Sequence, residues 1–282
     1  MKKSIMRATL PPSPQPLVKN LDAIKKAGFD GIQLGVGSDE LKLHTPKDGV
    51  TALAKACRDA GLEPHSIYGG ISFFHAEEAQ RKQELEHADH VLEIASLLGA
   101  KTILIHPGQL TRDIPYDACW RYAVDGLRAL KGKAEASHLR LGLENVWNKF
   151  LMSPLEAQRL LHEVDSPHVG IWFDVGNVTV FGFAEQWLRI LGGKRIVGLH
   201  IKDFRRGPND HFGTYEGFVP LFHGSVNWPA VMREIADLGV GDWLITEVSP
   251  GSQPYSHALR EIARQLDVLI SLAKDGNHPN KG

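Results

Sequence analysis

The strongest constraint on the fold is a regular alternation of short apolar segments with longer amphipathic ones. Eight short segments have the apolar composition of buried strands, and each is followed by a stretch in which apolar residues recur at helical spacing. The strand-like segments cover residues 5–10, 31–36, 63–68, 102–108, 140–146, 169–175, 196–202 and 243–248. Eight strand–helix units in a chain of 282 residues favour an α/β fold of the (β/α)8 barrel type, a TIM barrel.

The alternative α/β architecture is a doubly wound sheet, which also alternates strands and helices. The chain has no GxGxxG after its first strand-like segment and no P-loop motif, so the common nucleotide-binding members of that class are disfavoured. No shift in composition marks a linker. We therefore expect one domain over residues 1–275, followed by a short flexible tail at 276–282, where the sequence reads GNHPNKG.

Charge and cysteine content exclude several classes of partner. Lysine and arginine number 32 and aspartate and glutamate 33, so the net charge of −1 gives no attraction to nucleic acid or to an anionic membrane. No apolar run is long enough to span a bilayer. The two cysteines, Cys57 and Cys119, lie far apart in helix-like segments and fit reduced thiols. We expect a cytoplasmic protein.

Four side chains that bind metals or protons lie near the ends of consecutive strand-like segments. Glu144, Asp174, His200 and Glu247 stand at or near the ends of the fifth, sixth, seventh and eighth segments. In a barrel, residues at the carboxyl ends of the strands converge on one site. Three carboxylates and one imidazole suit a divalent ion such as Mn²⁺, Mg²⁺, Co²⁺ or Zn²⁺. The sequence therefore predicts a metal site.

Sequence motifs around these residues resemble a known superfamily. ENVWNKFLMSPLEA (144–157), WFDVGNV (172–178), LHIKDF (199–204) and ITEVSP (245–250) are similar to the xylose isomerase-like TIM barrels. Within that superfamily they resemble the sugar phosphate isomerase/epimerase branch, which includes the L-ribulose-5-phosphate 3-epimerase and D-tagatose 3-epimerase groups. The resemblance extends over nearly the whole chain and is strongest from residue 140 to residue 250.

The resemblance implies a reaction and roles for the four residues. It implies that Glu144, Asp174, His200 and Glu247 hold one divalent metal, with Mn²⁺ preferred, and that Glu144 and Glu247 are the acid/base pair. Removing a proton next to a ketose carbonyl creates an enediolate, whose charge a metal on the substrate oxygens stabilises. Two carboxylates on opposite faces of the carbon then exchange the proton and invert the centre.

Four further residues are expected to contact the substrate. Asn177 and Arg206 match substrate-contacting positions of the related epimerases. His65 and His106, on the third and fourth strand-like segments, are expected to point into the mouth of the barrel. The expected partner is a sugar or sugar phosphate, and relatives that form dimers or tetramers suggest a homo-oligomer.

The chain departs from its relatives at several positions that concern the substrate. Gln33 stands where many relatives have glutamate, and FHGSVNW (222–228) replaces a more acidic loop. Lys202, Arg205 and Arg206 are basic residues that could serve a phosphate group. The metal ligands are intact, so these departures leave the identity of the sugar, and whether it is phosphorylated, open.

Other activities remain compatible with the same four ligands. A dehydratase acting on an inosose or on dehydroshikimate could use them, and so could an aldose–ketose isomerase such as hydroxypyruvate isomerase. An endonuclease IV-like DNA repair enzyme is disfavoured by Asn177, where that family needs histidine, and by the near-neutral charge. A non-catalytic sugar-binding protein is disfavoured because no ligand carboxylate is missing.

Overall fold

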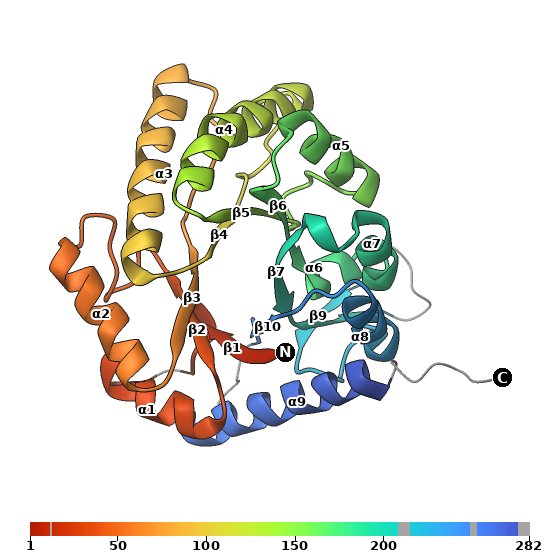
Figure 1. Cartoon of the computed structure of the whole chain (residues 1–282). Coiled ribbons are helices and arrows are strands. Elements are labelled where there is room, and N and C mark those ends of the chain that lie inside the picture. Colours follow the sequence, from red (N-terminus) through yellow and green to blue (C-terminus); the bar gives the residue numbers. More distant parts are fainter. Residues whose placement is uncertain (12, 208–214, 249–252, 276–282) are drawn as a thin grey trace.

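Eight parallel strands form a closed barrel at the centre of the chain (Figure 1). The computed structural model describes residues 1–11, 13–207, 215–248 and 253–275, so the predicted tail lies outside the described residues. Around the barrel the strands follow the order β1-β10-β7-β6-β5-β4-β3-β2. The strands are β1 (Lys2–Met6), β2 (Gly31–Gly35), β3 (Glu63–Tyr68), β4 (Thr102–Ile105), β5 (Arg140–Glu144), β6 (Val169–Asp174), β7 (Ile196–Ile201) and β10 (Trp243–Thr246). The predicted TIM barrel is confirmed.

Helices surround the barrel (Figure 1). They are α1 (Leu17–Ala27), α2 (Lys47–Asp59), α3 (Glu78–Leu98), α4 (Tyr116–Ala136), α5 (Pro154–Val164), α6 (Val175–Thr179), α7 (Ala184–Leu191), α8 (Trp228–Asp237) and α9 (Tyr255–Asp275). The short α6 lies at the end of β6, beside β7 and the later strand β8 (Asp203–Arg206). Two short 3-10 turns, η1 (Arg7–Thr9) and η2 (Gly193–Arg195), precede α1 and β7. No helix in the described part of the chain is both long enough and apolar enough to cross a membrane.

Local sequence signals explain where several helices begin and end. Ser153 caps α5, since its Oγ accepts a hydrogen bond from the backbone N–H of Glu156 at 3.2 Å, and Pro154 occupies the first helical position. Gly28 and Gly99 end α1 and α3 in left-handed conformations, with φ of 107° and 79°, which cost glycine little. These capping residues set where α1, α3 and α5 begin or end around the barrel.

A large aromatic side chain lies in the interior of the barrel. Trp172 on β6 is fully buried and packs with Leu104 and Ile245. Two glycines on the neighbouring strands make room for it. A Cβ on Gly198 would lie 2.7 Å from Cε3 of Trp172, and a Cβ on Gly142 would lie 3.0 Å from its Cβ. The indole therefore separates the two ends of the barrel.

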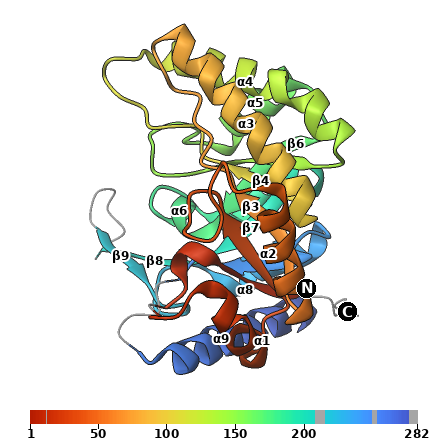
Figure 2. The same ribbon diagram turned by 90° about the vertical axis from the view of Figure 1, so that its left-hand side faces the viewer.

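Three features differ from the sequence-based expectations. The first strand is earlier than expected, at Lys2–Met6, because η1 occupies residues that we assigned to it. Between β7 and α8, where the sequence analysis placed no strand, the chain forms an antiparallel hairpin of β8 (Asp203–Arg206) and β9 (Tyr215–Val219). A short helix, α6, follows β6 directly. In Figure 2 the hairpin lies on the side of the barrel opposite the amino terminus.

Candidate metal centre

The four predicted ligands meet at the carboxyl-terminal end of the barrel. Glu144 and Asp174 are the last residues of β5 and β6, His200 is the penultimate residue of β7, and Glu247 follows β10 directly. Parallel pairing places Asp174 opposite His200. One ligand atom from each of the four residues lies within 4.8 Å of the others, and among the described residues this is the one such group. The four side chains form a candidate metal-binding cluster.

His200 is the centre of the cluster. Its Nδ1 faces oxygens of all three carboxylates, at 2.9 Å from Glu247 Oε2, 3.2 Å from Glu144 Oε1 and 3.6 Å from Asp174 Oδ2. On the other side of the ring, Nε2 donates a hydrogen bond to Gln33 Oε1 at 2.8 Å. A partner on Nε2 fixes the orientation of the imidazole and leaves Nδ1 as the nitrogen for a cation.

Burial and charge shift the pKa of His200 in opposite directions. Burial disfavours the imidazolium form, but the close carboxylates of Asp174, Glu144 and Glu247 outweigh burial and hold the pKa of His200 well above its ordinary value. Without a metal the ring is therefore protonated and balances part of the carboxylate charge. A cation that binds Nδ1 must displace this proton.

Lys202 supplies a second positive charge that the sequence reasoning did not assign to the cluster. Its Nζ lies 3.0 Å from Asp174 Oδ2 and 3.0 Å from Glu247 Oε2, and the side chain is 9 % exposed. Burial lowers the pKa of Lys202, but the charges of Asp174, Glu247 and Glu144 outweigh burial and raise it. The spacing of two from His200, which puts both side chains on the same face of an extended segment, is the signal that could have identified it.

The two glutamates have different electrostatic environments. Burial raises the pKa of Glu144, and the hydrogen bond and charge of His200 only partly offset that effect. Burial also acts on Glu247, but its hydrogen bond to His200 and the nearby charges of His200 and Lys202 outweigh it and hold the pKa of Glu247 well below its ordinary value. The charges of Asp174 and Glu247 also raise the pKa of Glu144, whereas Lys202, which forms an ion pair with Glu247, adds to the lowering of the pKa of Glu247 by His200.

The residues fit a divalent cation. Asp174 is completely buried, and its Oδ2 accepts no hydrogen bond of good geometry, although Lys202 Nζ lies near it. Its other oxygen, Oδ1, accepts from the backbone N–H of Asn177 at 2.7 Å, which holds the carboxylate in place. A buried carboxylate oxygen without a hydrogen bond, beside two more carboxylates and an imidazole, is a donor set for a hard or borderline metal ion.

A cavity of about 380 Å³ opens beside the cluster. It is lined by Met6, Tyr68, Leu104, His106, Glu144, Val146, Trp147, Asn177, His200, Lys202, Phe218 and Glu247. Trp147 stacks on Phe218 of the hairpin, with ring centroids 4.7 Å apart, and Lys202 Nζ lies 4.6 Å from the centroid of Phe218. The hairpin that the sequence did not predict thus contributes an aromatic wall.

Two of the four expected substrate contacts line this cavity. Both His106 and Asn177 do so, and Asn177 Nδ2 donates to the backbone oxygen of Asn145 at 3.0 Å. Burial lowers the pKa of His106. Their contact with substrate stays a prediction.

The other two expected contacts lie elsewhere. His65 does not reach the mouth: it stacks on Trp243 at the amino-terminal end, with centroids 3.9 Å apart, and its Nε2 is 2.8 Å from Ser4 Oγ. Arg206 packs against Phe183, with its Cζ 5.0 Å from the ring centroid, and does not line the cavity. A bulge in the pairing of β2 with β3 explains His65, since it puts Ser66, and not His65, opposite Gln33.

A family model and several curated proteins match most of the chain. The model described as xylose isomerase-like TIM barrel matches residues 21–270. The putative L-ribulose-5-phosphate 3-epimerase SgbU of Escherichia coli K12 is 23 % identical over 229 residues, which is 78 % of this chain and 80 % of that protein. A 3-dehydroshikimate dehydratase of Pseudomonas aeruginosa is 25 % identical over 207 residues, 72 % of this chain and 31 % of that protein.

Solved structures share the fold at low sequence identity. A D-tagatose 3-epimerase-like protein superimposes with a TM-score of 0.79 at 18 % identity, covering 98 % of this chain and 99 % of that one. The IolI protein, whose structure is described as having a bound zinc atom, superimposes with a TM-score of 0.78 at 21 % identity, covering 99 % and 100 % of the two chains.

Proposed function

The chain belongs to the xylose isomerase-like TIM barrel family, and from this premise we propose that it is a divalent-metal-dependent ketose 3-epimerase. The observation that carries the proposal is the position of Glu144 and Glu247. Both line the same cavity, and both lie against the imidazole of His200, yet they come from strands that β6 and β7 separate in the barrel wall. Two carboxylates on one cavity are what proton exchange on opposite faces of a carbon requires.

The proposed roles follow from the chemistry of epimerisation. One glutamate removes the proton from C3 of the ketose, and the other returns a proton to the opposite face. In the reverse reaction the two exchange roles, so both must reach the same carbon. Glu144, Asp174, His200 and Glu247 would hold the cation, which would stabilise the negative charge developing on the substrate oxygens. The zinc described for IolI supports a divalent ion, and Mn²⁺ is the one we propose.

Asn177 and Lys202 have supporting roles in this proposal. Asn177 holds Asp174 through its backbone N–H and lines the cavity, and its side chain would meet a sugar hydroxyl. Lys202 keeps Glu247 ionised and in place through their 3.0 Å ion pair. An ionised carboxylate that is already oriented can accept a proton without rearrangement.

The lining of the cavity favours a neutral ketose over a ketose phosphate. Lys202 is the one lysine or arginine that lines it among the described residues, and its charge is already paired with two carboxylates. The undescribed segments 208–214 and 249–252 contain neither lysine nor arginine. A phosphate group usually requires arginine, lysine or a cluster of backbone N–H groups. Trp147 and Phe218 instead offer an apolar surface for the face of a sugar ring or chain.

Exchange of protons into ketoses in D2O, followed by NMR, tests the proposal. Hexuloses, pentuloses and their phosphates would be incubated with added Mn²⁺ or Co²⁺ and with EDTA. We expect metal-dependent deuterium uptake at C3, faster with neutral ketoses. Uptake at C1 would instead identify an aldose–ketose isomerase. No exchange combined with loss of water from 3-dehydroshikimate or an inosose would identify a dehydratase, the second candidate, which the P. aeruginosa relative supports.

Glutamine variants test the two proposed acid/base residues. Glu144→Gln and Glu247→Gln should each lower the exchange rate by roughly 10²–10⁴-fold, the usual contribution of one acid/base group. Glu135→Gln is the control, because Glu135 is exposed on α4, far in the fold from the cavity, and should exchange at the wild-type rate. Wild-type exchange rates in both glutamine variants would contradict the proposed roles.

A further inference from the structure

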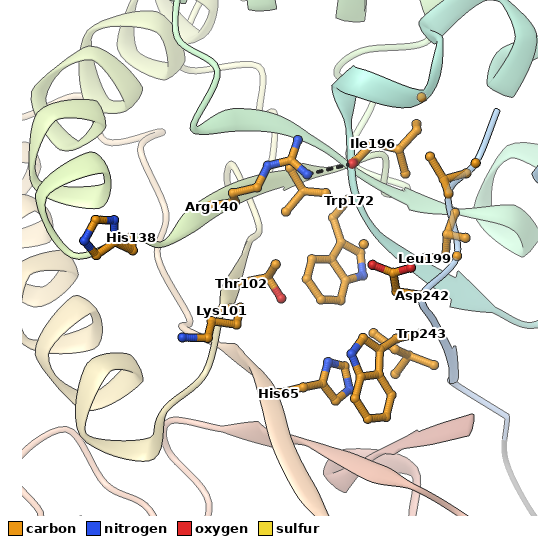
Figure 3. Close-up of a pocket in the computed structure, with 17 residues that line it drawn as sticks. His65, Lys101, Thr102, His138, Arg140, Trp172, Ile196, Leu199, Asp242 and Trp243 are labelled. Atoms are coloured by element: carbon orange, nitrogen blue, oxygen red, sulfur yellow. Dashed lines mark hydrogen bonds between the residues drawn. The ribbon is translucent and has the colours of Figure 1, made fainter. Parts of the chain in front are cut away.

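A second cavity opens at the amino-terminal end of the barrel, opposite the candidate metal centre. Its volume is about 410 Å³, within the range of roughly 300–1,000 Å³ typical of small-molecule sites. No residue in the described part of the chain lines both cavities. Trp172 forms the inner boundary of this second cavity and also contacts His200 edge-on, with ring centroids 5.3 Å apart. Figure 3 shows its indole lying across the cavity between Thr102 and Leu199.

The indole N–H of Trp172 has no acceptor in the described protein. The side chain is completely buried, and its Nε1 makes no hydrogen bond. A buried N–H without an acceptor is costly, and native structures rarely leave one. The ring cannot turn freely to seek another partner, because Gly142 and Gly198 leave just enough space for it on the adjacent strands. The donor is therefore held at the inner end of a cavity that is large enough for a ligand.

Positive charge dominates the residues that line this cavity. Arg140 is held at the start of β5 by two hydrogen bonds, from Nη1 to the backbone oxygen of Ile196 at 3.2 Å and from Nη2 to that of Lys194 at 2.9 Å. Lys101 lines the same cavity, and Asp242 is the one acidic residue among the described residues that line it. Two permanent cations against one carboxylate favour a ligand with negative charge.

A stacked aromatic pair forms one wall of the cavity, and Lys2 Nζ lies 4.7 Å from the centroid of its Trp243 ring. His65 and Trp243 stack face to face, with centroids 3.9 Å apart and an interplanar angle of 5°. Burial lowers the pKa of His65 to about 3, so its ring is neutral near neutral pH and adds no charge to this wall. A neutral aromatic surface beside cationic groups suits a ligand that has both a flat apolar body and an anionic group.

We propose that the amino-terminal cavity binds a small organic carboxylate that has a planar apolar body. One of its oxygens accepts the hydrogen bond of Trp172 Nε1, Arg140 and Lys101 supply the positive potential, and the apolar body lies against Trp243. This site is separate from the proposed catalytic cavity and does not depend on the proposed reaction.

Benzoate is the probe that tests the site, with the indole ¹⁵N–H resonances of the protein as the reporter. The chain has six tryptophans, and the Trp172→Phe and Trp243→Phe variants identify the two resonances of interest. Benzoate would be titrated at constant ionic strength, with sodium chloride as the balancing salt. We expect saturable shifts of the Trp172 and Trp243 resonances and none of Trp147, which lines the other cavity.

Variants of the lining establish which groups bind the probe. Arg140→Gln should weaken benzoate binding by roughly tenfold, and Trp172→Phe, measured on the Trp243 resonance, by roughly fivefold. Lys101→Gln changes an exposed side chain, so it should fold normally, and we expect a weakening of about threefold. Lys133→Gln is the control, since Lys133 lies on α4 and pairs with Asp89 away from the cavity; its affinity should not change.

Three results would overturn the proposal. Benzoate shifts that stay linear and do not saturate would indicate no site. A shift of Trp147 in place of Trp243 would place the benzoate at the catalytic end. Equal shifts with inorganic phosphate and with benzoate would show that the apolar wall does not contribute to binding.

Discussion

Lys202 places an ammonium group where a divalent cation would meet the same carboxylates. Removing one partner of a buried ion pair typically costs about 3–5 kcal/mol, because the remaining charges lose their compensation. We therefore expect Lys202→Met to lower the free energy of unfolding in EDTA by roughly 3 kcal/mol. The same variant should bind Mn²⁺ about tenfold more tightly, since the cation no longer meets a like charge beside Asp174 and Glu247.

Urea denaturation in EDTA and calorimetric titration with MnCl2 measure the two effects. Lys133→Met is the matched control, because its ammonium pairs with Asp89 at 2.6 Å on the exposed surface. Its loss should cost no more than about 1 kcal/mol and leave Mn²⁺ binding unchanged. Weaker Mn²⁺ binding by Lys202→Met would show that the ammonium helps to assemble the ligands and does not compete with the metal.

His65 should make the stability of the protein depend on pH. Burial, followed by the charge of Lys2, lowers its pKa from the ordinary value of 6.5 to about 3. The unfolded chain therefore binds a proton that the folded chain excludes, and the contribution of His65 to stability is lost as the pH falls from 6.5 towards 3. We expect this residue to contribute a slope of about 1.4 kcal/mol per pH unit within that window.

The difference between wild type and His65→Gln isolates this slope from the titration of other groups. Urea denaturation would be measured for both at several pH values within the window. The free energies of unfolding should differ most near neutral pH, where the neutral, stacked ring is fully stabilising, and converge as the solution becomes acidic. If the difference between the two free energies of unfolding stayed constant within this window, His65 would be protonated there in the folded state as well as in the unfolded state.

Gly198 on strand β7 has no side chain, and the space this leaves is occupied by the ring of Trp172. A Cβ on Gly198 would lie 2.7 Å from the ring of Trp172, so Gly198→Ala must displace the indole. We expect a loss of roughly 1–3 kcal/mol of stability, the usual cost of overpacking a core. Because Trp172 also contacts His200, this variant should in addition alter Mn²⁺ affinity.

Gly132→Ala makes the same substitution as Gly198→Ala, but within a helix. Gly132 lies inside α4, and nothing is within 4 Å of the position that its Cβ would take. The same chemical change should therefore stabilise the protein by roughly 0.5–1 kcal/mol, because alanine restricts the unfolded chain. Thermal denaturation of the two variants should give shifts of opposite sign. A stabilising Gly198→Ala would show that Trp172 is loosely packed.

The strands could be predicted from the sequence because each is a short apolar run between helical segments. The residues near the ends of these runs then identified the candidate metal ligands. Glu144, Asp174 and His200 needed only the rule that strand ends converge. His65 could not be placed, because the bulge between β2 and β3 leaves no mark in a single sequence. The β8–β9 hairpin was missed because its strands are only four and five residues long, and it packs through contacts such as that of Phe218 with Trp147.

The candidate metal centre joins four strands that are neighbours in the barrel. In the order β10-β7-β6-β5, each strand supplies one ligand within one residue of its end, whereas β1, β2, β3 and β4 supply none to the described cluster. A ligand at about 1,000 times its dissociation constant stabilises the folded state by about 4 kcal/mol. For a chain of this size we therefore expect saturating Mn²⁺ to raise the melting temperature by roughly 10 °C.

Hydrogen–deuterium exchange should show where this stabilisation acts. Local opening of strands near the cluster must break the metal site, so their amides should gain protection when Mn²⁺ is added. We expect the gain in β5, β6, β7 and β10, and little in β2 and β3, which reach the cluster only through the hydrogen bond of Gln33 to His200. Asp174→Asn should remove both the gain in protection and the rise in melting temperature. Equal protection of all eight strands would mean that Mn²⁺ stabilises the barrel only against global unfolding, and that its two halves already open as one unit.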